Sequence, residues 1–151
     1  MNVSLPTRIP QNDDSVPMLL ARSLGTPTRG TLLASATRTT ITSTGNLDLF
    51  GVRAVVLFLN ITAASAGGLR VNIDYQDPVS SLWRTLVIAP TAYIVTPGTY
   101  PIVVGAGFGS LNGSVINAGA ICGVALTSSM RFSVQHGDAN NQTYSLGYEI
   151  A

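Results

Sequence analysis

The chain has 151 residues, a length that suits one domain with an extension and is too short for two full domains. It carries eight basic residues, all arginine, against seven acidic ones, so the net charge is +1 with the single histidine neutral. Charged residues make up 10% of the chain, whereas about 25% is usual. Hydrophobic residues at 46% exclude an intrinsically disordered chain, and no apolar stretch approaches the roughly 20 residues of a membrane span. We therefore expect a soluble globular protein with an unusually uncharged surface.

The residue inventory excludes several chemistries. The absence of lysine rules out a Walker A phosphate site, a Schiff base and a Ser-Lys dyad. One cysteine and one histidine cannot build the usual zinc sets. Nucleic acid is not an expected partner, because phosphate binding needs concentrated positive charge and the arginines are scattered singly along the chain. They are Arg8, Arg22, Arg29, Arg38, Arg53, Arg70, Arg84 and Arg131.

Residues 1–29 form a proline-rich segment that differs from the rest of the chain. They hold four of the eight prolines, the Asp13-Asp14 pair and only short apolar clusters. Proline at this spacing blocks a long helix and a central strand, so we predict an extended arm that lies on its own domain or on a neighbouring chain. The residues expected to make partner contacts are Leu5, Pro6, Ile9, Pro10, Val16, Pro17, Met18, Leu19 and Leu20.

The sequence of residues 30–151 predicts a β-domain. Valine, isoleucine, threonine and aromatic residues dominate, and no long segment shows a helical period. The first expected strand comprises residues 31–35 and 38–43, with a break between them. The strongest run, 52–63, is apolar on both faces and is expected at the centre of a sheet. Residues 69–76 alternate apolar and polar side chains, which indicates a half-buried strand.

The middle of the chain predicts further short strands separated by turns. Residues 77–81 have the composition of a turn, because proline presets one turn dihedral and aspartate or serine accepts backbone hydrogen bonds. A strand is expected at 83–89. Residues 91–95 and 99–104 are predicted to form a hairpin around a Thr-Pro-Gly turn. Residues 105–117 are predicted to be a glycine-rich loop.

The last part of the chain completes the predicted fold. A strand is expected at 120–126, and the strands 130–136 and 142–150 are predicted to form the final hairpin. About eight short strands joined by glycine, proline and asparagine turns favour an all-β fold, an antiparallel β-sandwich or jelly roll. A core of this size is large enough to fold alone.

Few residues qualify for a catalytic or metal site. His136 and Asp138 are close in sequence, but a general base also needs a nucleophile or a substrate pocket, so we expect a solvated turn. Asp74 and Asp77 are too few carboxylates for a calcium site and are expected to be a strand-exterior charge and a turn residue. Cys122 is expected to be a small buried hydrophobic residue. We predict no catalytic site, no metal site and no cofactor.

Aromatic side chains support a different hypothesis, a carbohydrate-binding or receptor-binding sandwich. Its candidate residues are Trp83, Tyr93 and Tyr100. Aromatic residues at 7% are not enriched, and Trp83 by itself is expected to fill space in the core or between the sheets. This hypothesis is therefore the alternative to a structural role.

Four segments in a fixed order resemble a known family. They are LLASATRTTITS (32–43), VRAVVLFLNITAASAGGLRVNIDYQDPVSSLW (52–83), TPGTYPIVV (96–104) and MRFSVQHGDANNQTYSLGYEI (130–150). Together they resemble small β-sandwich proteins encoded in the structural gene modules of tailed bacteriophages. Ser81 departs from the family pattern, in which glycine is commoner at this position. The resemblance covers about residues 31–150 and leaves the arm uncovered.

The resemblance implies a non-enzymatic virion structural protein. Its first candidate role is that of a capsid decoration (cement) protein, which binds the major capsid protein on the outer surface of the capsid and stabilises the shell. Such proteins form homo-oligomers such as trimers and clasp neighbouring subunits with extended arms. A tail, neck or fibre component is the alternative within this resemblance. Neither nucleic acid nor a membrane is an expected partner.

Overall fold

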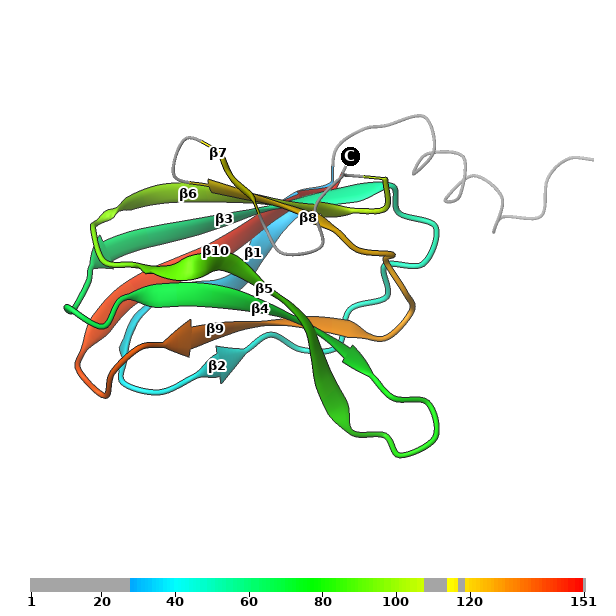
Figure 1. Ribbon diagram of the computed structural model, residues 1–151, viewed down its shortest axis with the longest axis horizontal. Coiled ribbons are helices and arrows are strands. Elements are labelled where there is room, and N and C mark those ends of the chain that lie inside the picture. The colour runs from blue at the N-terminus through cyan, green and yellow to red at the C-terminus, as the bar shows by residue number, and fades with distance from the viewer. Residues whose placement is uncertain (1–27, 108–113, 117–118, 151) are drawn as a thin grey trace, which may run out of the picture.

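The computed structural model describes residues 28–107, 114–116 and 119–150. These residues form ten strands in two sheets and no helix (Figure 1). This part of the chain accordingly contains no helix able to cross a membrane. The strands are β1 (Arg29–Arg38), β2 (Thr42–Ser43), β3 (Ala54–Ala63), β4 (Leu69–Gln76), β5 (Trp83–Ile94), β6 (Gly98–Gly105), β7 (Ser114–Ile116), β8 (Gly119–Gly123), β9 (Met130–His136) and β10 (Gln142–Ile150).

The two sheets have the strand order of a jelly roll. One sheet has six strands in the order β1-β10-β3-β6-β8-β7, and the other has four in the order β2-β9-β4-β5. Most connections carry the chain from one sheet to the other, so strands that are neighbours in sequence face each other across the core. β7 and β8 add a hairpin beside β6, and β8 runs parallel to β6. The predicted β-sandwich of jelly-roll type is confirmed.

The core lies between the sheets and is formed by alternate residues of each strand. In β3, Val55, Leu57, Leu59 and Ile61 are at most 1% exposed, whereas Asn60 on the opposite face is exposed. This alternation follows from the two-residue period of a strand. β3 pairs with β10 on one side and β6 on the other, which confirms the central position predicted for this run.

Alternation of apolar and polar residues locates several strands. β4, β9 and β10 have the predicted bounds, because apolar and polar residues alternate over most of each strand between turn residues. The polar residues Asn72, Asp74 and Ser133 are nevertheless buried. The middle of β4 is therefore buried on both faces, and the half-buried strand predicted at 69–76 is wrong there. β3 begins two residues after the predicted start at residue 52. β8 covers the predicted strand 120–126 only as far as Gly123.

The two predicted hairpins, around residues 96–98 and 137–141, are wrong. β5 and β6 belong to different sheets, and so do β9 and β10. Each of these turns therefore carries the chain across the core. Residues such as Pro97 and Gly137 favour a chain reversal, but they do not decide which strands then share hydrogen bonds. Because both strands at each turn present an apolar face to the core, they pack face to face.

Three further boundaries differ from the prediction. β1 runs without a break from Arg29 to Arg38, across two register shifts, and the break follows it. The two strands predicted on either side of Pro90 are one strand, β5. β5 tolerates a proline because it is the edge of its sheet. Residues 114–116 of the predicted loop 105–117 form β7.

The β4–β5 hairpin projects beyond the rest of the sandwich (Figure 1), and its turn contains a strained residue. Asp77 accepts hydrogen bonds from the N–H of Val79 (2.9 Å) and the hydroxyl of Ser80 (2.7 Å). Ser81 has a φ of +58°, a left-handed conformation that glycine adopts more easily. The residue that departs from the phage-protein pattern therefore occupies a position where the backbone favours glycine.

Substitution of Ser81 by glycine is predicted to stabilise the domain by roughly 0.5–1 kcal/mol, because it relieves the left-handed strain. Ser80→Gly is the matched control in the same turn. It should destabilise, since the hydroxyl of Ser80 binds Asp77. Urea unfolding followed by circular dichroism measures both changes. A lower midpoint for Ser81→Gly than for the wild type would contradict the strain at this position.

Candidate functional site

The arm residues predicted to contact a partner lie outside the described residues; they are Leu5, Pro6, Ile9, Pro10, Val16, Pro17, Met18, Leu19 and Leu20. At the start of the described chain, the carbonyl of Thr28 accepts a hydrogen bond from the N–H of Ile150 (2.8 Å). β1 pairs with β10 from Arg29 onward. A truncation that leaves β1 and its first contact intact therefore removes residues 1–27.

His136 and Asp138 belong to different sets of hydrogen bonds. The Nε2 atom of His136 lies 3.2 Å from the hydroxyl oxygen of the buried Tyr144. Burial lowers the pKa of His136, and the nearby charge of Asp138 opposes this shift only in part. The imidazole is therefore neutral at pH 7, and its ring packs edge-on against Tyr144. This arrangement holds the end of β9 against β10.

Asp138 ties together two turns at one end of the sandwich. Its carboxylate accepts hydrogen bonds from the hydroxyl of Ser65 (2.7 Å), the N–H of Gly67 (2.9 Å) and the N–H of Asn140 (3.1 Å). These hydrogen bonds, first that of Ser65, lower the pKa of Asp138 to about 2. The backbones are so close here that a Cβ on Gly137 would lie 2.1 Å from the carbonyl oxygen of Gly67. The contact is structural and joins the β3–β4 and β9–β10 turns.

The low pKa of Asp138 predicts a pH-dependent contribution to stability. The folded value of about 2 is below the ordinary value of 3.8, so the contribution is complete above pH 4 or so and is lost as the pH falls toward 2. Asp138→Asn should therefore lower Tm at pH 7, with a difference from wild type that shrinks between about pH 4 and pH 2. Thermal melts across this range test it, with Glu149→Gln at the other end of β10 as control. A difference in Tm between Asp138→Asn and wild type that stays constant with pH would contradict a stabilising role of the ionised Asp138 carboxylate.

Asp74 and Asp77 lie apart, one in the sheet and the other in the hairpin turn. Asp74 is 3% exposed and accepts hydrogen bonds from Ser133 (2.6 Å) and from Nε of Arg131 (3.2 Å). The expected strand-exterior charge is therefore wrong, because these partners allow the carboxylate to be buried. The guanidinium carbon of Arg131 lies 4.4 Å from the ring centre of Trp83. Among the residues that the structure describes, no three His, Cys, Asp or Glu side chains are grouped as they would be around a metal ion.

The aromatic residues of the carbohydrate hypothesis do not form one platform. Tyr100 is 8% exposed and belongs to the core. Tyr93 and Trp83 both lie on β5, and each has an arginine over one face of its ring. Trp83 is half-buried and does not belong to the core cluster, so the expectation that it fills space in the core is wrong. The guanidinium carbons of Arg70 and Arg131 lie 4.3 and 4.4 Å from the two ring centres. A sugar that stacked on either covered face would have to displace the arginine.

Cys122 is a buried residue of β8 with a free thiol. Burial raises its pKa to about 11, so the thiol is protonated at neutral pH and is a poor nucleophile. The expectation of a small buried hydrophobic side chain is confirmed.

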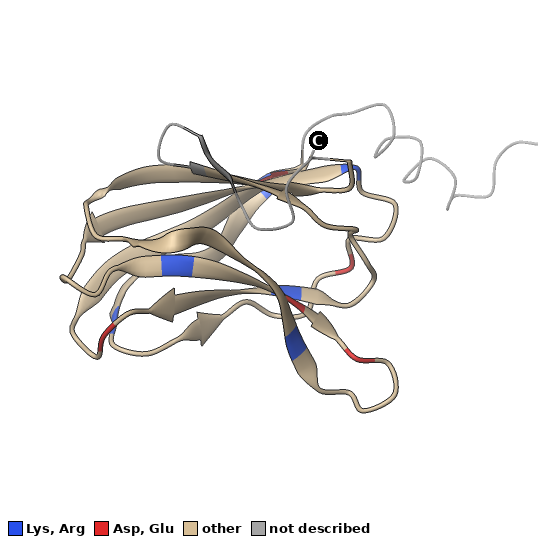
Figure 2. Ribbon diagram, in the orientation of Figure 1, with Lys and Arg blue, Asp and Glu red and all other residues tan. Residues whose placement is uncertain are grey.

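Charged residues are few along the described strands and turns (Figure 2). Several of their side chains have partners within the fold. Arg38 lies over the ring of Tyr144, with 4.6 Å between the guanidinium carbon and the ring centre, and donates to the carbonyl of Ala34 (2.7 Å). Apolar side chains are exposed instead. The largest of these are Ile41, Phe50, Val79, Leu82, Leu86 and Val95. The alternation of apolar and polar residues could not identify these exposed side chains, because most of them lie in turns or at strand ends, where the two-residue period no longer applies.

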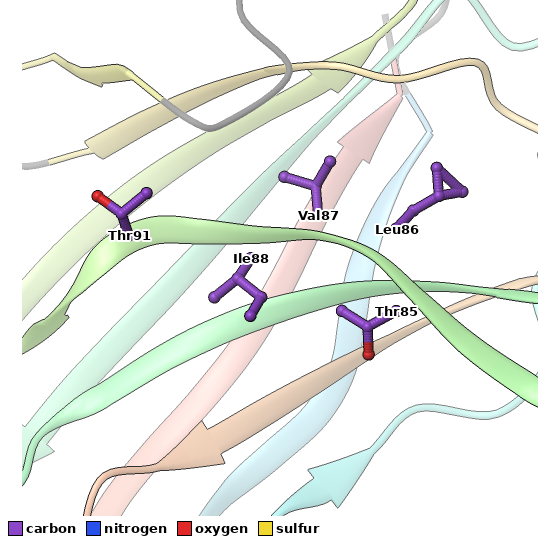
Figure 3. Close-up of a pocket in the computed structure, with 5 residues that line it drawn as sticks. All are labelled: Thr85, Leu86, Val87, Ile88 and Thr91. Atoms are coloured by element: carbon purple, nitrogen blue, oxygen red, sulfur yellow. The ribbon is translucent and has the colours of Figure 1, made fainter.

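A groove follows the edge strand β5 (Figure 3). Its volume is about 410 Å³, and its lining includes Thr85, Leu86, Val87, Ile88 and Thr91. The five side chains extend to both sides of the strand. Within the described residues, β5 pairs with β4 on one side and with no strand on the other. An edge of this kind can accept an added strand from another chain.

Comparison with protein-family models, with curated proteins and with solved structures finds no match for this chain. The resemblance to phage structural proteins therefore stays a prediction from the sequence. The candidate functional site is the neutral surface with its exposed apolar side chains, and the described residues contain no assembled catalytic group.

Proposed function

We propose that the protein is a non-enzymatic structural protein of a tailed-bacteriophage virion, a decoration protein that binds the major capsid protein on the outside of the capsid and stabilises the shell. The observation that carries this proposal is the neutral exposed surface. It is supported by the resemblance of residues 31–150 to phage structural proteins.

A neutral surface favours large permanent interfaces because charges are costly to remove from water. Interface cores are depleted in charged residues for the same reason. Here the charged side chains that an interface would have to desolvate are few, and five of them already have partners in the fold. They are Arg38, Arg70, Arg131, Asp77 and Asp138.

Exposed apolar side chains provide anchors for such an interface. In the projecting β4–β5 hairpin, Val79 is 93% exposed and Leu82 is 55% exposed, and Phe50 between β2 and β3 is 76% exposed. Side chains of this kind contribute binding energy when they enter a pocket of a partner. The proline-rich arm adds a second set of contacts across a subunit boundary. Many weak contacts repeated over a closed shell would resist internal pressure through multivalency.

The proposal predicts many copies of this chain in purified particles. Quantitative mass spectrometry should find hundreds of copies, in a simple ratio to the major capsid protein. A handful of copies would contradict the decoration role and place the protein in the tail, neck or fibre. Absence from particles would overturn the structural role altogether and return weight to the carbohydrate-binding alternative.

Removal of residues 1–27 is predicted to leave a folded sandwich that binds capsids at least tenfold more weakly, because the arm contacts and their avidity are lost. Binding to particles that lack the protein measures the effect. A thermal melt of the truncated protein serves as the control for folding. Full attachment of the truncated protein would show that the arm is not needed.

A further inference from the structure

A pocket of about 160 Å³ opens between the sheets where the described chain begins. Leu49 and Phe132 form its buried wall, and half-buried apolar side chains surround them. Among the described residues of the lining, Asp48 is the only charged one, and Thr28, to which the arm is attached, also belongs to the lining. The described lining residues are Thr28, Leu32, Leu47, Asp48, Leu49, Phe132, Tyr148 and Ile150.

The size and chemistry of this pocket suit one apolar side chain. An apolar cavity of roughly 150 Å³ holds a molecule as large as benzene, which is comparable to a leucine or methionine side chain. The partly exposed walls, among them Leu32, Leu47 and Ile150, would lose contact with water on insertion, which favours binding. The core is therefore incomplete at this edge and can accept an apolar group from outside.

The arm contains a segment that matches the pocket in chemistry. Residues 18–24, Met-Leu-Leu-Ala-Arg-Ser-Leu, lie in the proline-free stretch between Pro17 and Pro27. In this segment Arg22 is flanked by Leu20 and Leu24, which share its face in an extended chain. The segment thus presents leucine side chains for the apolar pocket and one positive charge for the carboxylate at its rim.

The link between the arm and β1 favours the pocket of another copy over the chain's own. Pro27 disfavours a helical turn at Thr26, so the sequence predicts an extended link. An extended link separates Leu24 from Thr28 by up to about 13 Å. Because Thr28 is itself part of the wall, an extended link of this length would reach beyond a pocket of about 160 Å³ and leave it free for the arm of another copy.

We propose that residues 18–24 of one copy dock in this pocket of a second copy, with a leucine inserted between the sheets and Arg22 beside Asp48. The inference deepens the proposed function by naming the neighbour of the arm. It rests on the arm of that proposal and not on the capsid partner, so purified protein tests it without particles.

Charge reversal in two separate copies tests the exchange. Sedimentation velocity at low salt should show oligomers of the full chain and monomers of the protein lacking residues 1–27. Arg22→Asp and Asp48→Arg should each weaken the association of the full chain by roughly fivefold or more. An equimolar mixture of the two variants should regain the association, because each reversed arm then meets a reversed pocket. High salt should reduce this effect, as expected for an exposed charge pair.

The apolar contact has a matched pair of variants. Leu47→Asp at the pocket should weaken association at least tenfold, because it places a charge where a leucine must insert. Ala63→Asp, an exposed position at the end of β3 far from Ile150 of the pocket, should leave association unchanged. Thermal melts identify any variant that fails to fold. For such a variant, a synthetic peptide of residues 15–27 is titrated into the wild-type and Ala63→Asp proteins lacking residues 1–27, and equal binding to both is expected.

Three results would overturn the proposal. A full chain that stays monomeric over the micromolar range would assign the arm to its own pocket or to another protein. Oligomers that persist without residues 1–27 would place the contact elsewhere. A mixture of Arg22→Asp and Asp48→Arg that does not regain association would contradict the contact between Arg22 of one copy and Asp48 of another. A decoration role on the capsid would survive each of these outcomes.

Discussion

Burial of two apolar sheet faces against each other is the constraint on which the rest of this structure depends. Tyr144 of β10 and Phe132 of β9 are fully buried, and they come from opposite sheets although their strands are neighbours in sequence. Each strand contributes alternate side chains to this layer, so the turns between strands must carry the chain across it. The jelly-roll order, the failure of the expected hairpins and the position of the open pocket at one edge all follow from this packing.

The sequence predicts the local elements of this fold better than their partners. The alternation around Ile73 and Val134 locates β4 and β9, because a two-residue period is a local property. Pro97 and Gly137 mark real turns, but pairing depends on distant residues, so no local pattern could show that these turns join different sheets. The same applies to the candidate site. The scarcity of charge is visible in the composition, whereas the exposure of Val79 and the pocket beside Asp48 depend on the tertiary structure.

The low content of charged residues explains why the surface is nearly neutral, since several of the few charged side chains already have partners within the fold. Arg131 pairs with Asp74 and covers Trp83, and Arg70 covers Tyr93, so these charges stabilise the outer face of the smaller sheet. A chain with 10% charged residues has few others to place on its surface. Its edges consequently lack the charged protection that usually prevents strand pairing between molecules. The stability of this outer face and the low charge of the exposed surface thus follow from the same small set of charged residues.

The central position of β10 has a consequence for synthesis on the ribosome. This last strand lies between β1 and β3, which leave the ribosome long before it. Until residues 142–150 emerge, β1 and β3 have no shared neighbour, and their pairing edges stay open to other nascent chains. The larger sheet therefore closes only after residues 142–150 have been synthesised. In the interval before β10 emerges, misassembly with other nascent chains competes with folding.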